Sequence, residues 1–145
     1  EAKSDFERAC NLGLEIACNN FKEMTGYFPS EKSDFYISKS IVSFNGDDWE
    51  SVLEYTNKAI ENDPENEHLF AIRAGAYANS GQLDKAIQDA DKSIFLNPEF
   101  GLAYNNKGYV LELLDRKRAA ITFYQISCDL GVELGCENLA RLLAH

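Results

Sequence analysis

A period of 34 residues constrains this chain more than any other feature. Pro64 and Pro98 lie 34 residues apart, and each ends a similar phrase, KAIENDP and KSIFLNP. In this register, three units cover residues 33–66, 67–100 and 101–134 without an insertion. A period of this length is typical of stacked helical repeats, in which each unit is one supersecondary element.

Small and large residues recur at matching places in the units, as two closely packed helices require. The second unit supplies Phe70, Ala74, Tyr77, Ala86, Ala90, Ser93 and Pro98, and the third supplies Tyr104, Gly108, Leu111, Ala120, Tyr124 and Ser127. The first unit follows more weakly, with Tyr36, Ser40, Ser43, Val52, Thr56, Ala59 and Pro64. These residues resemble the repeat pattern of the tetratricopeptide repeat family, and this resemblance implies one helical hairpin per unit.

The predicted fold is all-α, a right-handed helical-hairpin solenoid of about nine helices. Residues 1–32 are expected to form an N-terminal hairpin, and residues 135–145 a capping helix that begins at about Glu133. The segment Phe35–Phe44 is rich in β-branched residues, which favour strands. Ile37, Ile41 and Phe44 share one face at helical spacing, so we expect a helix there.

One position departs from the family pattern in every unit. Lys39, Arg73 and Lys107 stand where the family usually has leucine before glycine. Three cations along a groove would hold an acidic ligand. The alternative, which we favour, is that Arg73 pairs with Asp89 on the second helix of its own unit, because this position packs between helices.

Two cysteine phrases match each other almost residue for residue, CNLGLEIAC at 10–18 and CDLGVELGC at 128–136. They resemble the cysteine-rich Sel-like repeats, relatives of the tetratricopeptide repeats. This resemblance implies two disulfides, Cys10 with Cys18 and Cys128 with Cys136, and favours a periplasmic or secreted protein over a cytoplasmic one. The alternative is four small buried thiols in a reducing cytoplasm.

Composition excludes several function classes. Lys and Arg number 14 against 24 Asp and Glu, a net charge of −10, so nucleic acid is not an expected partner. No stretch approaches the roughly 20 apolar residues that cross a membrane, so membrane insertion is not expected. The sequence lacks the common metal-hydrolase, P-loop and dinucleotide motifs, and we expect no metal, no cofactor and no catalysis.

Charge is distributed unevenly along the units. The first unit has two basic and eight acidic residues, and this acidic end would steer a basic partner. Arg116, Lys117 and Arg118 crowd a turn of the third unit. They are either a solvated turn, which we favour, or a contact for an acidic group.

The resemblance implies that the first helices line a concave groove, which binds a peptide or a partner helix. Small residues beside larger ones would make a hollow there, with Asn79, Asn105 and Tyr109 available to bond a peptide backbone. The groove candidates are His68, Ala71, Gly75, Ala78, Asn79, Leu102, Asn105, Tyr109, Glu112 and Leu113.

The family's best-known ligand is the acidic C-terminus of a chaperone, held by lysines and asparagines. The corresponding positions here are Ile37, Ile41, Ala71, Gly75, Asn105 and Tyr109. Because the lysines are missing, we predict a protein-binding module for an apolar or basic segment. A second hypothesis is a structural segment of a longer solenoid, or a self-associating scaffold with no groove ligand. A third, an enzyme, would need a pocket around His68.

Overall fold

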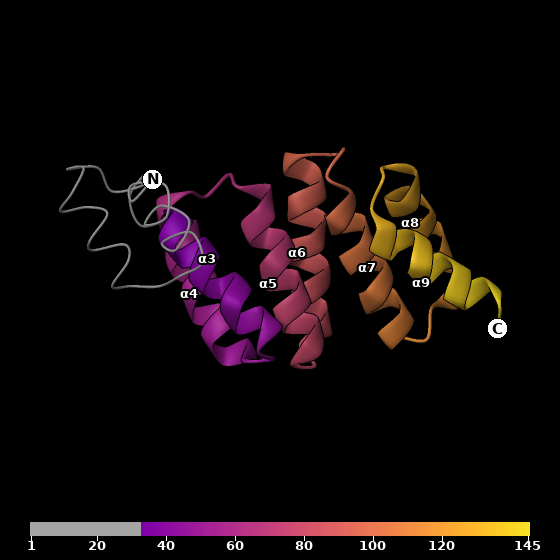
Figure 1. Cartoon of the computed structure of the whole chain (residues 1–145), viewed down its shortest axis with the longest axis horizontal. Helices are drawn as coiled ribbons and strands as arrows, with labels where there is room; N and C mark the ends of the chain where they lie inside the picture. The colour runs from indigo at the N-terminus through magenta and orange to yellow at the C-terminus, as the bar shows by residue number, and fades with distance from the viewer. Residues whose placement is uncertain (1–32) are drawn as a thin grey trace, which may run out of the picture. The chain divides into compact units, whose positions relative to one another are not determined.

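The structure, a computed structural model, describes residues 33–145 (Figure 1). The chain divides into two compact parts, an N-terminal part, Glu1–Glu65, and a C-terminal part, Asn66–His145. All regular elements of residues 33–145 are helices, which confirms the expected fold class. The N-terminal hairpin expected over 1–32, with Cys10 and Cys18, lies outside the described residues.

The described residues of the N-terminal part form one helical pair, α3 (Ser33–Asn45) and α4 (Trp49–Asn62). The β-branched segment of this unit is therefore helical, as its apolar spacing predicts. Asp47 forms the turn at a φ of 57°. The carboxylate of Asp48 then accepts a hydrogen bond from the Ser51 amide (3.2 Å), which caps the first turn of α4.

Five helices follow in the C-terminal part, each packed against the next along the chain (Figure 1). They are α5 (Glu67–Asn79), α6 (Leu83–Leu96), α7 (Gly101–Leu113), α8 (Lys117–Asp129) and α9 (Glu133–Leu143). The first helices of successive hairpins also touch, α5 with α7 and α7 with α9. The helix α9 begins at Glu133, where the sequence predicts the start of the capping helix.

The turns inside the hairpins use residues that tolerate left-handed backbone. Gly81 has a φ of 81°, and Asp115 has a φ of 59° at the equivalent place in the next hairpin. The amide after each turn residue reaches back to the helix, Gln82 to the Tyr77 carbonyl and Arg116 to the Leu111 carbonyl, both at 2.8 Å. These bonds satisfy carbonyls at the helix ends and fix where the chain reverses.

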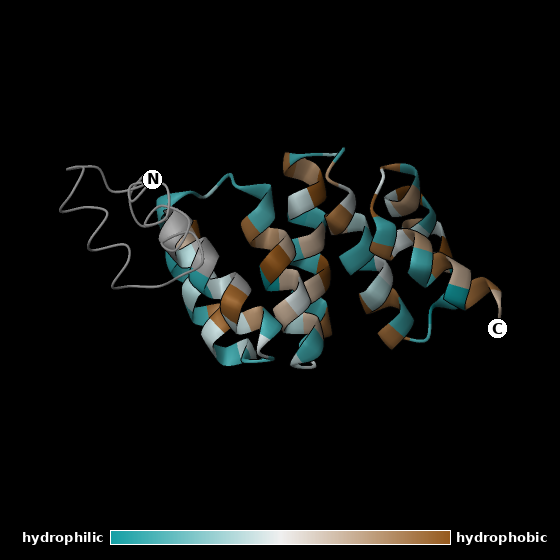
Figure 2. Cartoon of the chain, in the orientation of Figure 1, coloured by the Kyte–Doolittle hydropathy of each residue, from teal (hydrophilic) through white to brown (hydrophobic). Residues whose placement is uncertain are grey.

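Two clusters of buried apolar residues lie between the helices of the C-terminal part, Asn66–His145. One joins Ala78 of α5, Ala86 of α6 and Val110 of α7. The other joins Leu111, Ala120, Tyr124, Leu139 and Leu142, and so connects α7, α8 and α9. Hydrophobic and hydrophilic residues alternate along the ribbon of the helices (Figure 2). Leu139 and Leu142 therefore place α9 on the apolar cluster of the last hairpin, and we call this contact the seat of α9.

The closest approach inside the last hairpin is between Gly108 and Tyr124. A Cβ atom at Gly108 would lie 2.8 Å from the Cδ1 and Cε1 atoms of the Tyr124 ring. The ring is fully buried, with 0% of the residue exposed. Glycine is therefore present because α8 places an aromatic ring directly against the backbone of α7.

We predict that Gly108→Ala destabilises the protein although alanine favours helices. The helical gain is about 1 kcal/mol, whereas overpacking against a buried ring costs about 1–3 kcal/mol. Urea unfolding should show a lower free energy of unfolding for Gly108→Ala. The exposed position Gln88 on α6 is the control, since Gln88→Ala has no ring to displace and should leave the value unchanged. An increase for Gly108→Ala would contradict the packing account.

Candidate functional site

The candidate binding surface is formed by three helices of the C-terminal part, α5, α7 and α9. We call it the α5–α7–α9 surface. The expected groove residues lie on α5 and α7, while α9 adds two that the sequence prediction omitted, Asn138 and Arg141. Among these residues the structure finds both buried and exposed positions, and this difference decides what the surface can bind.

The small residues of α5 do not leave an open hollow. Ala71 is 0% exposed and Ala78 is 4% exposed, and Gly75 is also buried. The side-chain amide of Asn106 on α7 donates to the Ala71 carbonyl (2.7 Å). The expectation of an open hollow at these three residues is corrected, because all three are buried, and Ala78 packs against Val110 of α7.

Two of the three polar candidates bond each other across the surface, and the third is buried. The hydroxyl of Tyr109 donates to the Asn79 side-chain oxygen (3.1 Å) at an exposed place. Asn105 is 4% exposed, and its side-chain oxygen accepts from the Asn138 amide of α9 (3.0 Å). Asn105 is therefore not available to a peptide backbone, whereas Tyr109 and Asn79 are accessible.

Glu112 is the most heavily bonded carboxylate of the α5–α7–α9 surface. It accepts two hydrogen bonds from the guanidinium of Arg141, at 2.7 and 2.8 Å, and one from the Tyr124 hydroxyl at 2.9 Å. The bonds from Arg141 hold the pKa of Glu112 below its ordinary value. Burial, followed by the bond to Glu112, raises the pKa of Tyr124. Glu112 therefore fixes α9 to α7 and is not an open ligand group.

Apolar and aromatic groups occupy the remaining exposed part of this surface. Leu113 is 46% exposed near the end of α7, and Leu102 is half-buried near its start. The exposed His68 ring lies 4.5 Å, centroid to centroid, from Phe100. No cluster of three or more metal-ligating side chains occurs among the described residues, His68 included.

The departure at the basic position is explained by ion pairs. The Nε and Nη2 atoms of Arg73 donate to the two carboxylate oxygens of Asp89, at 2.7 and 2.9 Å, which confirms the expected pairing. The hydrogen bonds to Asp89 raise the pKa of Arg73. Lys107 donates to Asp91 (2.6 Å) and lies 4.5 Å from the Phe123 ring centroid. Arg73 and Lys107 thus replace leucine by bonding the second helices.

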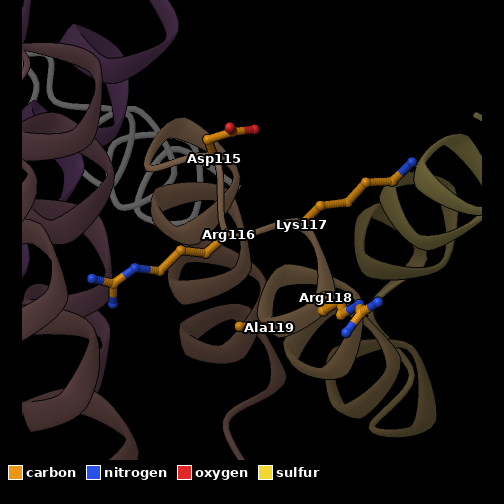
Figure 3. A pocket seen from close by; sticks show the side chains of 5 residues that line it. All are labelled: Asp115, Arg116, Lys117, Arg118 and Ala119. Atoms are coloured by element: carbon orange, nitrogen blue, oxygen red, sulfur yellow. The ribbon is translucent and has the colours of Figure 1, made fainter.

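The basic turn of the last hairpin borders a shallow surface hollow of about 420 Å³. Its lining is Asp115, Arg116, Lys117, Arg118 and Ala119. Figure 3 shows the Arg116 and Lys117 side chains extending in opposite directions. Because the cations do not converge on one point, the turn offers no chelating arrangement for an anion, in agreement with the favoured interpretation of a solvated turn.

A disulfide joins the end of α8 to the start of α9 in the structure. Cys128 and Cys136 have their Cα atoms 4.5 Å apart, within the range that a disulfide requires. Gly131, at a φ of 89°, turns the chain between them. Nearby, a Cβ at Gly135 would lie 2.5 Å from the Ser127 hydroxyl oxygen, so α8 and α9 meet at very short range.

Known proteins share both the sequence pattern and the fold. No protein-family model matches the chain. It is 36% identical over 91 residues to the small glutamine-rich tetratricopeptide repeat-containing protein 2 of Mycosarcoma maydis, an overlap of 63% of this chain and 25% of that protein. The helical hairpins are tetratricopeptide repeats. A tetratricopeptide-repeat assignment therefore rests on sequence as well as on helix packing.

Two further comparisons concern a plant relative and a solved complex. The SGT1 homolog of Oryza sativa subsp. japonica is 36% identical over 108 residues, 73% of this chain and 28% of that protein. The first TPR of Spaghetti (RPAP3) bound to the HSP90 peptide SRMEEVD superposes with a TM-score of 0.70, at 21% identity, over 79% of this chain and 93% of that one. The latter likeness shows the fold alone, and the chain spans about a quarter of the length of the two sequence relatives.

No helix among residues 33–145 is both long and apolar enough to cross a bilayer.

We predict that Asp89→Ala lowers the free energy of unfolding by about 3 kcal/mol, because it leaves the largely buried Arg73 without its carboxylate. The double variant Arg73→Leu with Asp89→Ala restores the leucine of the family pattern and removes the stranded charge. It should recover to within about 1 kcal/mol of the natural protein in urea unfolding. Equal losses in both variants would mean that the ion pair is not the reason for the basic residue.

Proposed function

We propose that this chain is a non-catalytic protein-protein interaction module that binds a peptide or a partner helix on the α5–α7–α9 surface. The observation that supports the site is the combination of exposed Leu113 and Asn79 with half-buried Tyr109, which joins apolar area to hydrogen-bonding groups. The similar tetratricopeptide-repeat structure bound to an HSP90 peptide supports the class of function.

We further propose that the bound segment is apolar or basic rather than an acidic chaperone tail. The three Lys and Arg residues of α5, α7 and α9 are Arg73, Lys107 and Arg141, and each is paired with a carboxylate of this chain. An acidic peptide would have to displace one of these pairs, since a carboxylate needs a cation to replace its hydration. A basic segment meets no such obstacle on a chain of net charge −10.

A specific observation also favours the alternative function, a segment of a longer solenoid or a self-associating scaffold. Leu130, Leu134 and Leu143 at the α8–α9 end are 40%, 48% and 65% exposed. Exposed leucines on a terminal repeat are suited to covering by a further repeat or by a second copy. In that case the α5–α7–α9 surface would bind no peptide of its own.

We propose that Cys128 and Cys136 are bonded in the folded protein, as in the Sel-like repeats that their phrase resembles. The Cα separation and the position between two antiparallel helices support this bond. Its formation would place the protein in an oxidising compartment, periplasmic or secreted, at least when it matures.

The function is tested by selecting peptides from a library of random displayed 12-residue segments. We expect enrichment of apolar or basic sequences, and no saturable binding of the acidic peptide SRMEEVD. The variant Leu113→Lys should weaken the selected peptides at least about tenfold, a loss of about 1.4 kcal/mol, because it places a desolvated charge in the contact.

The control is Phe95→Lys, which changes an apolar side chain of α6 that is 77% exposed and lies outside the proposed surface. It should leave peptide affinity unchanged. Binding that both lysine variants leave intact would place the site elsewhere, and selection that yields acidic peptides would contradict the proposed chemistry. Failure to select any peptide would favour the structural-segment function.

A further inference from the structure

The last helix is attached to the hairpin before it at both of its ends. Near its start, Cys136 is bonded to Cys128 at the end of α8. Toward its other end, Arg141 makes two hydrogen bonds to Glu112 of α7, at 2.7 and 2.8 Å. Between these attachments, the Asn138 amide bonds Asn105. The α9 helix therefore covers polar groups of α7 that belong to the α5–α7–α9 surface.

The apolar seat under α9 is small. Only Leu139 and Leu142 of this helix reach the core with large side chains, at 9% and 8% exposure. The helix has 11 residues, fewer than the roughly 12–15 at which an isolated helix becomes even marginally stable. Its helical state thus depends on its attachments to α7 and α8.

One contact in this seat is unfavourable. The Ser127 hydroxyl is buried against Gly135 and has no hydrogen-bond partner among the described residues. A buried hydroxyl without a partner costs about 1–3 kcal/mol, and it regains hydration when the helices separate. This contact favours separation of α9 from α8, and the covalent bond between Cys128 and Cys136 opposes it.

We propose that the Cys128–Cys136 bond is a redox latch that holds α9 on α7 and α8. With the bond intact, α9 stays seated and Asn105 and Glu112 are occupied. When the bond is reduced, α9 leaves its seat and exposes these two residues together with the Leu111 side chain. The effect on ligand binding rests on the proposed function, because it alters the same surface, whereas the release of α9 does not.

The reduction requires a dithiol reductant. One thiolate of the dithiol attacks a cysteine sulfur and displaces the other, forming a mixed disulfide, and the second thiolate then releases the remaining cysteine. Two electrons and two protons pass to the chain, which gains two thiols, while the reductant becomes a disulfide. Cys128 and Cys136 are both only half-buried, so their sulfurs lie in a part of the fold that a reductant approaches without global unfolding.

Hydrogen exchange of the whole chain, measured by mass spectrometry with and without a dithiol, tests the latch. Peptide mapping without reduction first establishes the Cys128–Cys136 bond. On reduction we expect amide exchange in α9 to accelerate at least about tenfold, while α5 and α6 keep their rates. The intact bond restricts the conformations available to α9 when it opens, even though the loop that it closes is short. Unchanged α9 exchange on reduction, or free thiols at both positions under air, would overturn the proposal.

Matched cysteine variants assign the effect to this pair. In Cys10→Ser with Cys18→Ser, the dithiol must still accelerate α9. In Cys128→Ser with Cys136→Ser, α9 must exchange fast under both conditions, with helicity of the preceding hairpins retained by circular dichroism. Slow α9 exchange in the latter variant would overturn the latch.

Affinity for the selected peptides separates this inference from the proposed function. We expect a change of at least about tenfold in affinity between the oxidised and reduced chain, because α9 uncovers Asn105 and Glu112. Released α9 with equal affinity in both states would overturn the regulatory part. Absence of any peptide binding would overturn the proposed function, while accelerated exchange would still support the latch.

Discussion

The contact between Gly108 and the Tyr124 ring is the constraint on which the C-terminal half of this protein depends. Glycine allows the ring to lie against the α7 backbone, and the ring position then sets where the Tyr124 hydroxyl points. That hydroxyl bonds Glu112, which in turn receives the guanidinium of Arg141. One close approach inside a hairpin is therefore transmitted through two polar contacts to the helix that follows it.

The sequence was sufficient for those features that lie within one repeat. The 34-residue period predicted the helical hairpins, and the position of Arg73 between the two helices of its repeat predicted its ion pair with Asp89. Both depend on residues of the same unit, whose relative geometry the repeat fixes. The left-handed turn at Gly81 was predictable for the same reason, since few other residues adopt that backbone.

Features that depend on a neighbouring repeat were not predictable in this way. A helical pattern assigned Ala71 and Asn105 to the binding face, but the side chains that fill the space beside them, Asn106 and Asn138, come from another helix. The Glu112–Arg141 pair joins residues that are 29 positions apart in the sequence. Arg141 lies on α9, beyond the last of the three 34-residue units. The spacing of Asn138 and Arg141 on one face of α9 was the available signal, since residues three apart are neighbours on a helix.

The account is tested most directly by a double-mutant cycle between Tyr124 and Arg141, using Tyr124→Phe, Arg141→Met and the double variant in urea unfolding. Both side chains bond the Glu112 carboxylate, and the Arg141 guanidinium also interacts with the Tyr124 hydroxyl. If this three-residue network transmits the hairpin packing to α9, the two substitutions should be coupled by about 0.5–1.5 kcal/mol. Additive effects would contradict the account, because they would mean that α9 is held independently of the Gly108–Tyr124 contact.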